Sequence, residues 1–146
     1  MRQQRNLTAA LIAMSSFGVG CDAIHNDVSE SASHKRFINA DCSVKYPLNA
    51  FGVTKKIKRN KEADFVALTD LRLSGPEITF SAILETGTKL QVISVRQCTN
   101  CLFETRVEYQ VKVAPEPREF QAAPVFLDAQ PLSSGQIVCN LAQNAA

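Results

Sequence analysis

The amino-acid sequence predicts a mainly β domain, folded as a small antiparallel barrel or sandwich. Apolar and polar residues alternate along its most regular segments, and clusters of turn-forming residues separate these segments at short intervals. Several short strands with this spacing are typical of small β barrels and sandwiches. Five or six strands are predicted, near residues 64–73, 77–84, 89–97, 102–113, 119–127 and 136–141.

The longest predicted strand alternates without a break. Its apolar face consists of Phe103, Thr105, Val107, Tyr109, Val111 and Val113. Its charged and polar face consists of Glu104, Arg106, Glu108, Gln110 and Lys112. Because successive side chains of a strand point to opposite faces, the pattern predicts an antiparallel strand with one buried and one wet face.

Turn clusters and prolines bound the other strands. Ser74–Pro76 and Glu85–Gly87 flank the strand near 77–84, and Ser133–Gly135 precedes the last strand. Pro115 ends the long strand, since proline cannot donate to a strand ladder. Residues 87–95, Gly-Thr-Lys-Leu-Gln-Val-Ile-Ser-Val, resemble the Gly-Thr-x-Leu-x-Val strand of bacterial SH3-like barrels. That resemblance implies an SH3-like barrel as one form of the domain.

The chain opens with an export signal. Arg2 and Arg5 precede an apolar run from Leu7 to Val19, which is shorter than the ~20 residues that a membrane-spanning helix needs. A basic start, a short apolar core and small residues are typical of a cleaved secretory signal.

A cysteine directly after this signal makes residues 1–21 resemble a bacterial lipoprotein leader. Gly20 before Cys21 fits the family pattern, whereas Gly18 stands where the family prefers leucine. The resemblance implies that Cys21 carries the lipid and becomes the new N-terminus. The acidic residue Asp22 after it resembles an inner-membrane retention signal. The alternative is cleavage nearby, for instance after Ala23, which gives a secreted protein without lipid.

The leader divides the chain into a signal peptide, residues 1–20, a lipidated flexible tether, residues 21–36, and one β-rich domain, residues 37–146. The tether is polar and serine-rich and shows neither a helical nor a strand period. Its two histidines, His25 and His34, are interpreted as solvated linker residues rather than metal ligands.

A basic run from Lys55 to Lys61 holds five positive charges in seven residues. It is interpreted as a solvated loop, with contact to anionic lipid headgroups as the alternative.

Net charge gives no support for nucleic-acid binding. The whole chain has 16 Lys and Arg against 14 Asp and Glu, and two of the arginines lie in the leader. The mature chain is therefore formally neutral, with no basic excess to bind a phosphate backbone.

The cysteine count agrees with export. Cys21 is either lipidated or removed with the leader, so four of the five cysteines remain free to pair. In an oxidising envelope these are expected to form two disulfides, Cys98 with Cys101 and Cys42 with Cys139. The other two connectivities stay open.

The Cys98–Cys101 motif is the only recognisable chemical motif, and a structural disulfide at a tight turn is its favoured interpretation. A turn centred on Thr99 and Asn100 sets a strand register in which Val92 faces Val107 and Leu90 faces Tyr109. Two alternatives remain. A thioredoxin-like redox site needs a helix after the motif, and a zinc ribbon needs a second Cys-x-x-Cys.

The sequence therefore predicts no metal, no cofactor and no catalytic residue. It predicts a bacterial envelope lipoprotein facing the periplasm, held to the membrane by its lipid. Its expected role is a non-enzymatic binding or accessory module for an envelope protein, a peptide or cell wall. The alternatives are a secreted inhibitor-type protein without lipid, a thiol–disulfide protein using Cys98 and Cys101, and a hydrolase with a deep pocket of perturbed carboxylates.

Overall fold

The computed structural model describes residues 23–55, 62–101 and 104–141, without the side chains of residues 100, 101, 104 and 105. It confirms a mainly β fold. Its strands are β1 (Ile24–Asp27), β2 (Asp41–Val44), β3 (Leu48–Val53), β4 (Phe65–Thr69), β5 (Ile78–Leu84), β6 (Lys89–Cys101), β7 (Glu104–Ala114), β8 (Val125–Asp128) and β9 (Ile137–Asn140). Its short helices are η1 (Lys35–Phe37), η2 (Arg118–Phe120) and α1 (Ala129–Ser133).

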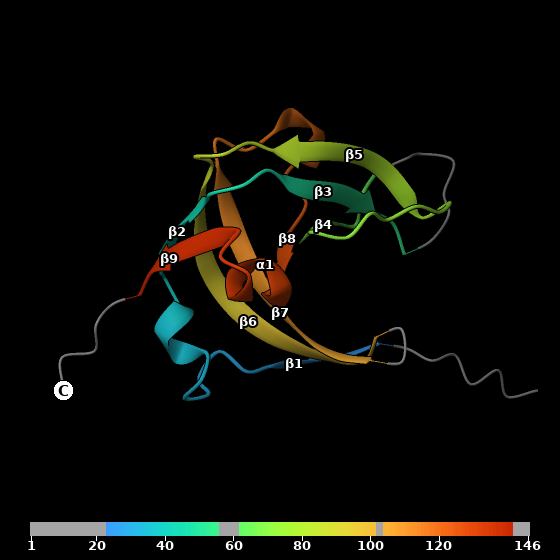
Figure 1. Ribbon diagram of the computed structural model, residues 1–146. Coiled ribbons are helices and arrows are strands. Elements are labelled where there is room, and N and C mark those ends of the chain that lie inside the picture. The colour runs from blue at the N-terminus through green and yellow to red at the C-terminus, as the bar shows by residue number, and fades with distance from the viewer. Residues whose placement is uncertain (1–22, 56–61, 102–103, 142–146) are drawn as a thin grey trace, which may run out of the picture.

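The strands form one sheet in the order β5-β3-β4-β8-β7-β6-β2-β9 (Figure 1). β1 pairs with β6 on the same side as β2, so these two short strands share one edge of the long strand. β4 and β8 run parallel, and the other pairs are antiparallel. No described strand joins β5 to β9, so the sheet stays open rather than closing into a barrel.

The predicted tether is wrong for its residues 23–36, which belong to the folded domain. β1 pairs with β6 from Ile24 opposite Thr99 to Asp27 opposite Arg96. The Ser29 hydroxyl then accepts a 2.8 Å hydrogen bond from the Val95 backbone N–H. Because all four β1 residues lie exposed at the sheet edge, the strand has no apolar period for sequence analysis to detect.

The predicted register of β6 and β7 is also wrong. Val92 lies opposite Val111 rather than Val107, and Leu90 lies opposite Val113 rather than Tyr109. Cys98–Cys101 lies inside the end of β6 instead of forming the turn, and Cys101 pairs with Glu104. Each partner shifts by four residues, an even number, so the same side chains still face the core.

The predicted strand over 119–127 is shorter than expected. Its first half is the helix η2 followed by Gln121 and Ala122, both with positive φ angles of 50° and 59°. The left-handed backbone of these two residues turns the chain, so that β8 begins only at Val125.

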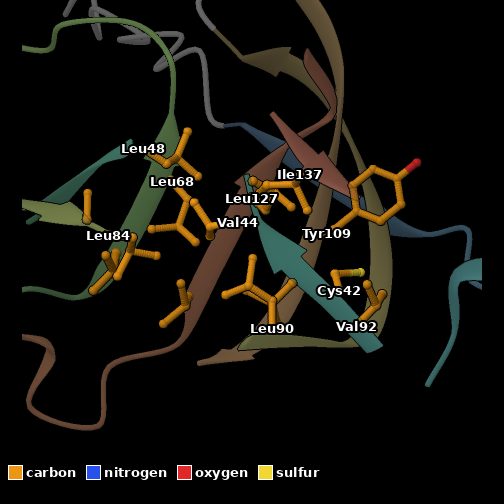
Figure 2. Packing of buried hydrophobic residues seen from close by; sticks show 14 of the residues in the cluster. Cys42, Val44, Leu48, Leu68, Leu84, Leu90, Val92, Tyr109, Leu127 and Ile137 are labelled. Carbon is orange, nitrogen blue, oxygen red and sulfur yellow. The ribbon is translucent and has the colours of Figure 1, made fainter. Parts of the chain in front are cut away.

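The core lies on one face of the sheet, called the inner face. Figure 2 shows Val44, Leu48, Leu90 and Leu127 from four strands gathered there with Tyr109. The predicted apolar face of the long strand is confirmed from Val107 to Val113. Residues 102 and 103 lie outside the described residues.

Two further features fix the fold. The predicted disulfide between Cys42 and Cys139 is present and joins directly opposed residues of β2 and β9. At Gly52 of β3, an added Cβ would collide with the Phe80 ring, so the close approach of β3 and β5 requires glycine there. Among the described helices, none is long and apolar enough to cross a membrane.

Candidate functional site

Polar side chains of four neighbouring strands form a row across the other, outer face of the sheet. Asp27 lies opposite Arg96, Arg96 lies opposite Glu108, and Glu108 lies opposite Asp128. Directly opposed residues of paired strands place their side chains on the same face. These four residues, called the polar row, therefore cross β1, β6, β7 and β8 in line.

The centre of the polar row is an ion pair held against an aromatic ring. Arg96 Nε donates a 2.7 Å hydrogen bond to Glu108 Oε2, and Arg96 Nη2 lies 2.6 Å from the same oxygen. The guanidinium also lies 3.4 Å from the ring centroid of Phe126, whose ring meets Phe65 edge to face. The Glu108 side chain is 13% exposed, so this pair is better shielded from solvent than an ordinary surface ion pair.

Asp128 ends the row in a partly buried position. Burial raises the pKa of its carboxyl, and the charges of Glu108 and Asp70 act in the same direction. A side-chain hydrogen bond with Thr69 and the charge of Arg106 oppose this and favour the ionised form. The site therefore brings together two carboxylates with different surroundings, one paired with arginine and one disfavoured as an anion.

We expect Asp128→Asn to change how stability depends on pH. The raised pKa means that the native state holds this proton more tightly than the unfolded chain, whose ordinary value is 3.8. Native stability contributed by Asp128 is therefore greatest below that value and falls as pH rises through the native pKa. The variant lacks this fall, so its free energy of unfolding should improve relative to the natural protein as pH rises above 3.8, the ordinary value of the carboxyl.

Urea unfolding at several pH values measures that difference. The loss of the carboxylate contact with Thr69 changes the free energy of unfolding of the variant at every pH. The test is therefore the slope of the free energy of unfolding against pH. Asp41→Asn, at an exposed residue that does not contribute to the pKa of Asp128, serves as the matched control. Parallel curves for the natural protein and Asp128→Asn would contradict the assignment.

The predicted cysteine sites are only partly described. Cys98 is fully buried and disulfide-bonded. The side chain of Cys101 lies outside the described residues, so the pairing of these two cysteines stays a prediction. Cys21, the predicted lipidation site, also lies outside them.

Both histidines contact the sheet, which corrects their interpretation as linker residues, while His25 is exposed to solvent. His25 Nε2 lies 3.9 Å from Cys98 Sγ, and burial lowers the pKa of His25, helped by the charge of Arg96. His34 Nδ1 lies 3.3 Å from the hydroxyl of Tyr109, whose pKa is raised by burial. Within the described segments, no three His, Cys, Asp or Glu side chains come close enough together to hold a metal ion.

The two hollows found at the surface are shallow and separate from the polar row. One, of about 550 Å³, lies along β2 with Lys45, Lys89 and Asn140 around it. The other, of about 340 Å³, lies beside Ile93 and Glu116. Asp128, whose carboxyl has the raised pKa, lines neither of these two hollows.

Comparison with known proteins finds no matching family model, curated protein or solved structure. The function is therefore inferred from the residues of this chain alone.

One member of the polar row, Glu108, was predicted from the sequence. The alternation in the long strand predicted that Glu108 points outward, and it does. Asp27 lies in the segment that was predicted to be a tether. Arg96 and Asp128 belong to strands whose register the sequence does not specify, and the signal for them was only that each lies in a predicted strand or directly after one.

Proposed function

We propose that this protein is an envelope lipoprotein, anchored through Cys21, whose β domain is a non-enzymatic binding or accessory module facing the periplasm. The sequence basis is the leader, with its basic start, short apolar run and cysteine after Gly20. The partner we expect is an envelope protein, a peptide or cell wall.

The observation that carries the proposal is the disulfide between Cys42 and Cys139. It joins residues 97 positions apart, at the start and end of the domain. Disulfides persist in oxidising compartments such as the periplasm and are rare in the bacterial cytosol. The cross-strand disulfide and the leader are independent observations, and both favour export.

The polar row supports a binding role rather than catalysis. The guanidinium of Arg96 already forms an ion pair with Glu108 and lies over the Phe126 ring, so it holds the outer-face side chains in place. The row is carried on regular strands, and its residues line neither of the two hollows described above. This arrangement suits recognition of another surface better than enclosure of a small substrate.

Intact mass measurement tests the anchor. The protein is expressed in a bacterium with its own leader and alkylated with and without reduction, beside a Cys21→Ser variant. We expect a chain that starts at Cys21 with added acyl chains, and four cysteines that resist alkylation until reduced. The variant should carry no acyl mass. A full-length or unlipidated natural chain, or cysteines that react without reduction, would contradict the proposal.

One observation favours the thiol–disulfide alternative, namely the 3.9 Å contact between His25 and the disulfide-bonded Cys98. Basic neighbours stabilise a thiolate leaving group and ease disulfide exchange. The same alkylation experiment, repeated in a glutathione redox buffer, separates the two functions. A redox protein would show alkylation of Cys98 while Cys42 and Cys139 stay protected.

A further inference from the structure

Covalent geometry limits how far the folded sheet can lie from residue 21. Only Asp22 and Ala23 separate Cys21 from Ile24, the first residue of β1. An extended chain spans at most 3.3–3.6 Å per residue, so this connection reaches about 10 Å. The polar headgroup layer on each side of a bilayer is roughly 5–7 Å thick. A lipid on Cys21, as proposed above, would therefore hold the edge of the sheet at the headgroups.

The end of the molecule around β1 has the composition of a membrane-contact surface. The apolar side chain of Ile24 is 58% exposed to solvent. Its neighbour His25 points to the opposite face of β1, in a cross-strand row with Cys98 and Arg106, so both faces of the sheet contribute to this end. Figure 1 shows β1 with the far ends of β6 and β7 at this end of the molecule.

Positive charge gathers at the same end. Burial lowers the pKa of His25, and the charges of Arg96 and Lys55 act in the same direction, against the carboxylate of Glu108. The nearby carboxylate of Asp64 is engaged locally, since it accepts a 2.7 Å hydrogen bond from the Lys55 backbone N–H. Lys55 begins the basic run found in the sequence, and residues 56–61 lie outside the described residues.

We propose that Ile24, His25, Lys55 and Arg106, called the anchor-side surface, bind the anionic headgroups of the membrane that holds the Cys21 lipid. This inference depends on the proposed lipid anchor. An exposed apolar side chain beside cationic ones is the pattern that peripheral proteins use at a bilayer surface, where basic residues are drawn to anionic lipid. The domain then lies directly on the bilayer instead of moving on a flexible tether. β9, which reaches the opposite end of β6 through β2, then lies away from the bilayer.

The chain contains no tryptophan, which allows a site-specific fluorescence test. Ile24→Trp places the only indole on the anchor-side surface. Val138→Trp is the matched control, at a residue of β9 that is 46% exposed. β9 reaches β6 through β2 at Lys89–Gln91, whereas β1 pairs further along β6, at Arg96–Thr99. Each lipidated variant is reconstituted into phosphatidylcholine vesicles with phosphatidylglycerol and a headgroup spin-labelled lipid.

Quenching of Ile24→Trp with little quenching of Val138→Trp is the expected result. Equal quenching, or none at Ile24→Trp, would overturn the anchor-side surface while leaving the lipoprotein proposal intact. Retention of the Cys42–Cys139 disulfide checks that each variant folds. Protection of Ile24→Trp by a bound protein, in place of quenching, would also overturn the proposal.

Intact mass is measured first, so that the two proposals fail separately. If no acyl chain is present, the lipid anchor is wrong. Flotation of the unlipidated protein with phosphatidylglycerol vesicles then tests whether the anchor-side surface binds anionic headgroups without a lipid. Lys55→Gln should then weaken binding about fivefold, the effect of removing one cationic side chain near an anionic membrane. Lys112→Gln, an exposed β7 lysine opposite Gln91, should leave it unchanged. Absence of binding, or equal effects of the two substitutions, would overturn the surface.

Discussion

Replacing both Cys42 and Cys139 with alanine is expected to lower the free energy of unfolding by about 4–5 kcal/mol. The disulfide closes a loop of 97 residues, and the chain-entropy model gives about 4.7 kcal/mol for a loop near 100 residues. β9 is a terminal strand of the sheet, paired with β2 over only four residue positions. The disulfide therefore contributes much of the stability of the pairing between β2 and β9.

Urea unfolding of the double variant beside the oxidised natural protein measures the loss. Amide exchange gives a local readout, because the backbone of Ile137–Asn140 should lose protection first. Reduction of the natural protein also breaks the disulfide of Cys98, so the reduced protein should be at least as destabilised as the double variant. A double variant as stable as the oxidised protein would show that packing alone holds β9.

Phe120→Ala is expected to cost about 3–5 kcal/mol, the usual range for removing a buried phenylalanine ring. Phe120 is completely buried although it comes from a three-residue helix in a loop. Its ring stacks on Phe80 of β5, with 5.9 Å between centroids. The inner face of the sheet thus depends on a side chain that no strand supplies.

Two comparison variants separate ring burial from general disturbance of the loop. Phe120→Leu keeps most of the apolar volume and should cost less than half as much. Phe126→Ala removes a half-buried ring on the outer face, under Arg96, and should also cost less. Thermal or urea unfolding of the three variants ranks them. A ranking in which Phe126→Ala is the most damaging would contradict the placement of Phe120 at the centre of the core.

The polar row and the anchor-side surface have different roles in this picture. The row orders the outer face through the Arg96–Glu108 pair and leaves a partly buried carboxyl at Asp128. In the proposed arrangement, the anchor-side surface would orient the whole domain, because only Asp22 and Ala23 separate β1 from Cys21.

Local pattern determined much of the β structure. The alternation from Val107 to Val113 predicted the buried face of β7, and the turn residues at Ser74–Pro76 and Glu85–Gly87 bounded β5 correctly. Cysteine parity led to the pairing of Cys42 with Cys139. These features depend on the period of apolar side chains, on turn-forming residues and on the number of cysteines, all of which are local properties of the sequence.

Only the tertiary structure decided the remaining features. β1 joins the domain through backbone hydrogen bonds at an exposed edge of the sheet. Because its side chains are not buried, residues 24–27 show no alternation of apolar and polar residues. The four-residue shift between β6 and β7 keeps the same side chains buried, so the apolar pattern could not choose between the two registers. That register, together with the pairing of β7 with β8, sets Arg96 beside Glu108 and Glu108 beside Asp128. Contacts between distant strands depend on which backbone groups pair in space, and a one-dimensional pattern does not contain that information.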